Sequence, residues 1–164
     1  MDFRNFELAP FNLLDKEWAL LTAGDKNKYN TMTVSWGSMG TTWGKPSVTV
    51  YVRPNRYTYE FIENSEYFSL SFYDVEYKKD LRVLGSISGR NTDKIANTNL
   101  TPEVLENGIS FKEANLTIVC KKMYHQDMKI EDFPEEVINQ YFKEDPVHHM
   151  YIGEVVEIMD NRKK

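Results

Sequence analysis

The chain has 164 residues, 41% of them hydrophobic and 13% aromatic, a length that suits one compact domain spanning residues 1–164. Its net charge of −5 is opposite in sign to that of a nonspecific nucleic-acid binder. The single cysteine, Cys120, excludes an intrachain disulfide framework and a cysteine-based zinc site, and favours a reducing, cytoplasmic location. The apolar runs are far shorter than the ~20 residues of a membrane span, and the N-terminus lacks the basic start of a signal peptide, so we expect a soluble, unprocessed protein.

Alternation of apolar and polar residues with a period of two is the main pattern along the chain. It predicts strands over residues 30–36, 47–53, 68–73, 114–120 and much of 149–158, all rich in β-branched and aromatic residues. In the first strand, one face would carry Asn30, Met32, Val34 and Trp36, and the other Thr31, Thr33 and Ser35. Gly37, Gly40 and Gly44 fall between two strands, where turns or bulges account for them.

Three short helices are expected, over residues 57–63, 76–84 and 134–142. Asn55 would cap the first, Gly85 would end the second in the left-handed conformation, and Pro134 would open the third. Residues 100–108 look polar and loop-like. Because strands outnumber helices and do not alternate regularly with them, the pattern favours a mainly β, mostly antiparallel barrel with peripheral helices over a doubly wound parallel sheet.

The usual nucleophilic and metal-binding signatures are absent from the sequence. Cys120 lies in the middle of a predicted strand with the apolar set, which indicates a buried, inert thiol. His148 and His149 are adjacent, so in a strand they point to opposite faces and do not chelate one metal ion together. We therefore expect no metal site.

Three segments together suit a flat, phosphorylated, aromatic ligand. Residues 30–36 offer hydroxyl groups beside an indole, residues 53–58 place two arginines at the start of a helix, and residues 88–94 form a further basic loop. Each segment also has an ordinary structural explanation. The threonines would be the solvated face of an edge strand, Arg53 and Arg56 would pair with Glu60, Trp36 would pack in a core, and Lys94 would be a solvated surface charge.

At these residues the sequence resembles the flavin reductase-like, FMN-binding split-barrel proteins of the flavoredoxin type. The shared motifs are N-x-M-T-x-S-W at residues 30–36, R-P-x-R-Y-T at 53–58, S-G-R-x-x-D-K at 88–94 and H-x-x-x-I-G-E-V at 148–155. They occur in the family's order, and the resemblance runs from about residue 10 to residue 158. It implies a six-stranded antiparallel split barrel that forms a homodimer and binds FMN non-covalently near the subunit interface.

The resemblance also implies which residues hold the cofactor. The expected FMN-binding residues are Asn30, Met32, Thr33, Ser35, Trp36, Arg53, Arg56, Tyr57, Thr58, Ser88, Gly89, Arg90 and Lys94. Lys94 is the candidate for stabilising negative charge on reduced flavin, and His149 is a further catalytic candidate at the mouth of the site, where packing against the barrel is an equal alternative.

The implied function is NAD(P)H-dependent reduction of a flavin or another small electron acceptor, by hydride transfer to bound FMN. No dinucleotide fingerprint marks a separate nicotinamide site. The first alternative is a flavoredoxin-like electron carrier that oxidises NAD(P)H slowly. A second is a binding module for another planar ligand such as haem.

Overall fold

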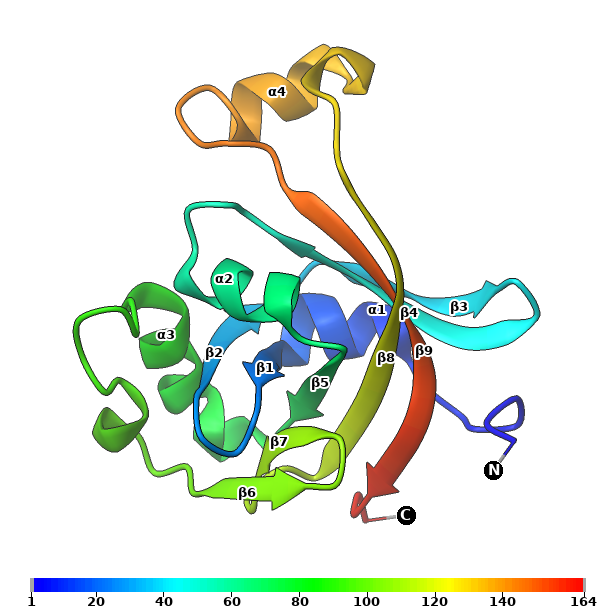
Figure 1. Cartoon of the computed structure of the whole chain (residues 1–164), viewed down its shortest axis with the longest axis vertical. Coiled ribbons are helices and arrows are strands. Elements are labelled where there is room, and N and C mark those ends of the chain that lie inside the picture. Colours follow the sequence, from blue (N-terminus) through cyan, green and yellow to red (C-terminus); the bar gives the residue numbers. More distant parts are fainter. Residues whose placement is uncertain (1, 164) are drawn as a thin grey trace.

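A computed structural model describes residues 2–163 (Figure 1). Within that range, seven strands form one antiparallel sheet in the order β2-β1-β5-β8-β9-β4-β3. Its strands are β1 (Ala19–Gly24), β2 (Tyr29–Val34), β3 (Gly37–Thr42), β4 (Lys45–Val52), β5 (Tyr67–Phe72), β8 (Leu116–Asp127) and β9 (His149–Asp160). The sheet does not close, because β2 and β3 are its two edges. The mainly β, antiparallel prediction is confirmed, with seven strands where six were expected.

All five predicted strands are present, as β2, β4, β5, β8 and β9, and two further strands join them. β1 shows no alternation because it is buried on both faces: Leu21 lies in the main core and Leu20 in a second cluster. Gly37 and Gly40, which were expected in turns or bulges between two strands, instead lie in β3, which pairs with β4 from Gly37 to Thr42. A turn follows at Gly44, which has a φ of +73°.

The prediction of a loop at residues 100–108 is also wrong. It forms most of a hairpin of β6 (Pro102–Leu105) and β7 (Gly108–Phe111). The hairpin is fastened to the main sheet by buried hydroxyl groups, because Ser69 Oγ donates to the Ile109 carbonyl at 2.5 Å and Ser71 Oγ lies 3.0 Å from Ser110 Oγ. Thr101, Glu103 and Glu106 in this segment are exposed, which is why its sequence looks loop-like.

The three expected helices are α2 (Tyr57–Asn64), α3 (Lys78–Ser86) and α4 (Glu135–Tyr141), and α1 (Pro10–Asn12) is a single turn. A π-helical turn spans Leu13–Glu17, and 3-10 turns span Val75–Tyr77, Ile95–Asn97 and Ile130–Asp132. Two predicted helix ends are wrong. Arg56, not Asn55, is the N-cap of α2, and Gly85 lies inside α3 rather than ending it in the left-handed conformation.

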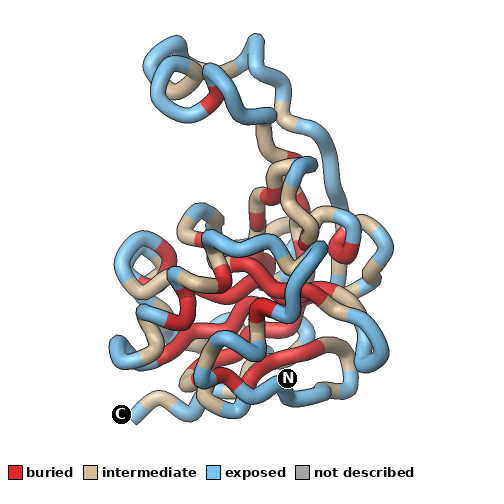
Figure 2. The backbone as a smooth tube through the Cα atoms, turned by 90° about the vertical axis from the view of Figure 1, so that its left-hand side faces the viewer, coloured by how far each residue is buried: buried red, intermediate tan, exposed pale blue. Residues whose placement is uncertain are grey.

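The buried residues form two clusters on opposite sides of β1. The main core fills the inner face of the coiled sheet, and the second lies between β1, α3 and β7. Cys120 is fully buried in the main core, and burial raises the pKa of its thiol, as expected for an inert cysteine. The α4 segment, residues 128–148 between β8 and β9, projects from this body on the ends of these two strands and is mostly exposed (Figures 1 and 2). No helix within residues 2–163 has the length and apolar character needed to cross a membrane.

Candidate functional site

The hydroxyl row of β2 is covered rather than solvated. Thr31 is fully buried, and its hydroxyl lies 2.9 Å from that of Thr22 on β1. Thr33 Oγ1 donates to the Leu81 carbonyl of α3. A Cβ added at Gly85 would lie 3.1 Å from Thr33 Cβ, so glycine permits the close approach of α3 to β2. Although β2 is an edge strand, α3 therefore shields this face from water.

The other face of β2 holds Asn30 and Met32 inside the protein. Met32 packs in the main core, and Asn30 Nδ2 donates to Thr58 Oγ1 of α2 at 2.8 Å with both side chains buried. Ser35 is half-buried just beyond the strand, and Trp36 is 42% exposed. The more solvent-exposed part of the first motif therefore lies towards its C-terminal end.

Two cations meet at the C-terminal end of α3. Arg56 Nη2 donates to the Gly85 carbonyl at 3.1 Å, and Lys94 Nζ donates to the Leu84 carbonyl at 2.9 Å. Lys94 is only 3% exposed, so it is not a solvated surface charge. Burial, and then the charge of Arg56, lower its pKa to about 8. Among the described residues neither cation has a carboxylate within 4.0 Å, although the negative end of the helix dipole lies beside both.

The loop of residues 88–94 lies directly on Asn30 and Tyr57. A Cβ added at Gly89 would lie 2.3 Å from Asn30 Oδ1, so a larger residue would push the loop away. The Arg90 guanidinium lies 4.8 Å from the centre of the Tyr57 ring and forms a 2.5 Å ion pair with Glu60. The hydroxyl of exposed Ser88 accepts a hydrogen bond from the Arg90 backbone N–H. Glu60 thus pairs with Arg90, not with Arg53 or Arg56.

A cavity of about 290 Å³ opens where these segments meet. Its lining includes four of the expected binding residues, Asn30, Tyr57, Gly89 and Lys94. Thr58 holds one lining residue in place by accepting the hydrogen bond of Asn30, and Arg56 acts on another, Lys94, through its charge. Parts of all three motifs predicted to act together are therefore brought together.

Arg53 points away from this cavity, towards the α4 segment. Its guanidinium forms a 2.6 Å ion pair with Asp145, donates to the Tyr141 carbonyl at 3.3 Å, and lies 3.4 Å from His148 Nε2. Trp36 is on the same side, with its ring 4.9 Å from that of Tyr141 and 5.5 Å from that of His148. Trp36, Tyr141 and His148 are among the residues that line a second, aromatic cavity of about 280 Å³. Burial, and then the charge of Arg53, lower the pKa of His148 to about 4, so its imidazole is neutral at pH 7.

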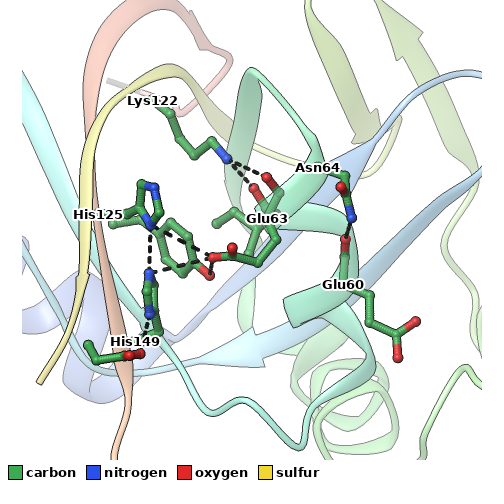
Figure 3. Close-up of polar contacts among 9 residues, drawn as sticks. Glu60, Glu63, Asn64, Lys122, His125 and His149 are labelled. Atoms are coloured by element: carbon green, nitrogen blue, oxygen red, sulfur yellow. Dashed lines mark hydrogen bonds and ion pairs between the residues drawn. The ribbon is translucent and has the colours of Figure 1, made fainter.

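His149 faces the opposite side of β9 and belongs to a polar cluster that the sequence did not predict (Figure 3). Its Nδ1 lies 2.6 Å from Asp127 Oδ1, and its Nε2 lies 2.8 Å from His125 Nδ1 and 3.5 Å from Glu63 Oε1. The Tyr151 hydroxyl donates to Glu63 Oε1 at 2.5 Å. The cluster joins the end of α2 to β8 and β9, and it places His149 apart from Lys94 and Trp36.

Comparison with protein families decides the assignment. The model of the flavin reductase like domain matches residues 13–164. The chain belongs to this family. No curated protein matches it in sequence.

Solved structures share the flavin reductase-like fold at low sequence identity. A flavoredoxin from Methanosarcina acetivorans is 23% identical, with a TM-score of 0.68 over 88% of this chain and 68% of that one. An FMN-binding protein from Thermus thermophilus, solved with 1-cyclohex-2-enone, is 18% identical, with a TM-score of 0.71 over 98% and 80% of the two chains. An NADH:FAD oxidoreductase from Streptomyces globisporus is 14% identical, with a TM-score of 0.67 over 88% and 74%.

Within this flavin reductase-like domain, the thirteen expected binding residues divide into two groups. Arg53 and Trp36 lie against the α4 segment, and Ser35 follows β2 on the way to Trp36. The remaining residues surround or support the cavity that Asn30 and Lys94 line, except Met32, whose side chain packs in the core.

Proposed function

We propose that the chain binds FMN, with its phosphate at Arg56 and Lys94, and acts as an oxidoreductase that accepts electrons from NAD(P)H and passes them to a flavin or another small acceptor. The observation that carries the proposal is the pair of enclosed cations at the end of α3, which have no carboxylate partner among the described residues. Two like charges held together inside a protein favour an anionic ligand.

The donors around the cations fit a phosphate group. A guanidinium has five N–H donors and an ammonium three, and the structure uses one of each on the α3 carbonyls. In the proposal the remaining donors bind the phosphate oxygens, and Lys94 is the one of the two cations that lines the adjoining cavity. Asn30, Thr33 and Thr58 fix the walls of the site through their hydrogen bonds, so that little ordering is needed when a ligand binds.

A flat ring would need the other group of residues. Trp36 presents a partly exposed indole beside Ser35, and the neutral imidazole of His148 lies on the far side of that indole. The chemistry supplied by bound FMN is two-electron transfer from a nicotinamide. In this proposal the protein holds the phosphate and orients the ring. Because Lys94 is placed at the phosphate, the role expected for it in stabilising charge on reduced flavin is not part of the proposal. For His149 the geometry favours a role in the Glu63 cluster over one at the ring.

We also propose that a second copy of the chain completes the site. The cavity at the end of α3 is about 290 Å³, which is at the lower limit of pockets that enclose a small-molecule ligand. Exposed Trp36, at the other end of the expected ligand, is then available for contact with a partner subunit. This agrees with the homodimer that the sequence motifs imply.

An electron carrier without efficient NAD(P)H oxidation is the second candidate, because a flavoredoxin and an NADH:FAD oxidoreductase share this fold equally well. The test is a titration of the purified full chain with FMN, followed by anaerobic stopped-flow mixing with NADH and with NADPH. We expect saturable FMN binding and rapid bleaching of the flavin band by one nucleotide. Tight binding with slow bleaching identifies the carrier, a Soret band in the isolated protein identifies haem, and failure to bind FMN contradicts both flavin proposals.

FMN affinity should depend on pH through Lys94. The ammonium binds the phosphate, and its pKa of about 8 in the free protein means that it loses its proton as the pH rises above 8. Affinity should therefore change little between pH 7 and 7.5 and be about tenfold lower at pH 9 than at pH 7. Fluorescence titrations across this range measure it. Lys94→Arg keeps its charge throughout and should show a flat profile, whereas a fall of equal size in that variant would assign the effect to another group.

A further inference from the structure

We propose that Glu63, His125 and His149 form a zinc site with one coordination position open to solvent. The site lies where the end of α2 meets the β8–β9 hairpin and uses none of the residues proposed to hold the phosphate (Figure 3). Each residue offers one ligand atom, namely Glu63 Oε1, His125 Nδ1 and His149 Nε2.

The spacing of the three ligand atoms fits a single metal ion. The distances are 2.8 Å between the two nitrogens, 3.5 Å from His149 Nε2 to Glu63 Oε1, and 3.9 Å from His125 Nδ1 to the same oxygen. The circle through the three ligand atoms has a radius of about 2.0 Å. An ion lying just above its centre, as in tetrahedral coordination, is then slightly more than 2.0 Å from each atom, close to the Zn–N and Zn–O bond lengths of about 2.0–2.2 Å. The mean distance between the three ligand atoms also agrees with the ~3.4 Å that separates the ligand atoms of tetrahedral zinc. It exceeds the ~3.0 Å between neighbouring ligand atoms of an octahedral ion with similar bond lengths.

The surrounding hydrogen bonds prepare the ligands. The Asp127 carboxylate accepts a hydrogen bond from His149 Nδ1 at 2.6 Å, so the proton is on Nδ1 and the lone pair of Nε2 faces the cluster. A carboxylate behind a ligating imidazole is the usual second layer of a zinc site. The Tyr151 hydroxyl orients the Glu63 carboxylate by donating to Oε1, the oxygen that is also the proposed ligand atom. In the absence of metal, His125 Nδ1–H donates a hydrogen bond to the lone pair of His149 Nε2. When a cation binds, the His125 ring changes tautomer, so that its proton is on its own exposed Nε2 and Nδ1 is free to bind the metal.

The backbone holds these groups in place, and water reaches them. On paired strands β8 and β9, Asp127 lies opposite His149, and His125 lies opposite Tyr151. Lys122 Nζ fixes the end of α2 by donating to the carbonyls of Ile62 and Glu63, at 2.5 and 3.0 Å. The carboxylates of Glu63 and Asp127 outnumber that one ammonium, which favours a cation. The His149 side chain is only 8% exposed, whereas that of His125 is 54% exposed and leaves a path for the ion and a water ligand.

The test uses the untagged full chain after treatment with a chelator. Isothermal titration with zinc chloride should show one equivalent bound per chain, and cobalt(II) should give the intense visible absorption of a tetrahedral site. His125→Ala and Glu63→Gln should each weaken zinc binding by about 100-fold or more, and Asp127→Asn, which removes only the orienting carboxylate, by about 10- to 100-fold.

His148→Gln is the matched control, since it removes the neighbouring imidazole outside the cluster and should keep the affinity of the original chain. Circular dichroism checks that each variant is folded, and exposed His125 can be replaced without opening the core. Zinc binding that is absent from the original chain, or unchanged in His125→Ala, would overturn the proposal. Weak multiple binding that His148→Gln reduces as much as His125→Ala would do so too.

Discussion

Replacing Arg56 with methionine should weaken FMN binding by about 10- to 150-fold. A charge-assisted hydrogen bond contributes about 1.5–3 kcal/mol, and Arg56 is one of the two cations proposed to bind the phosphate. Burial and the charge of Arg53 already lower the pKa of the guanidinium, so its removal relieves an unfavourable enclosed charge. The variant should therefore remain folded, and the loss should appear in affinity rather than in stability.

Arg82→Met is the matched control for this experiment. Arg82 lies on α3, the helix whose Gly85 carbonyl Arg56 contacts, but it is exposed and its guanidinium lies 5.9 Å from the ring of Trp18. Titration of apoprotein with FMN, followed by quenching of flavin fluorescence, measures both variants. If Arg56→Met binds FMN as tightly as Arg82→Met does, the phosphate is not held at the end of α3.

Replacing Gly153 with alanine should lower the free energy of unfolding by about 3 kcal/mol, at the upper end of the usual cost of overpacking a core. A Cβ at this position in β9 would lie 2.7 Å from Cys120 Cβ and 2.7 Å from the edge of the Phe68 ring. Both neighbours are in the main core, and Cys120 Cβ is held close to the β8 backbone, so the strands must separate or the ring must move.

Gly40→Ala separates this packing effect from the general effect of alanine in a strand. Gly40 is in β3, and a Cβ there would meet no atom within 4 Å. Urea denaturation should show near-original stability for Gly40→Ala. Adding Phe68→Leu to Gly153→Ala should recover part of the loss beyond what the two single variants predict. Equal stability of the two alanine variants would show that the Phe68 ring does not limit the size of the side chain that fits at position 153.

The sequence predicted the parts of the fold in which one face of a strand is buried and the other is polar. Alternation located β2, β4, β5, β8 and β9. It missed β1, because Leu20 and Leu21 are buried in different clusters, and β3, because its small residues resemble a turn. The interior position of Gly85 in α3 follows from contact with Thr33, which is distant in sequence and has no local signal.

The motifs predicted the candidate site to a similar extent. Asn30, Arg56 and Lys94, each from a different motif, lie close together in the structure. Each motif includes a strand, a helix start or a loop whose position the fold determines. The motifs did not predict that Arg53 would pair with Asp145, since that contact depends on the position of the α4 segment. The Glu63 cluster was missed because the strand over residues 114–120 was expected to end before His125, whereas β8 continues to Asp127.

The two cations at the end of α3 raise the affinity for an anionic ligand but lower the stability of the apoprotein. Without an anion, Arg56 and Lys94 repel each other where little water reaches them, and the pKa of Lys94 is lowered first by its burial and then by that repulsion. A neutral residue at position 94 should give an apoprotein that is easier to keep folded and a site that is harder to fill. Selection of this domain for thermal stability alone, without cofactor present, would therefore tend to discard the charge on which the proposed function depends.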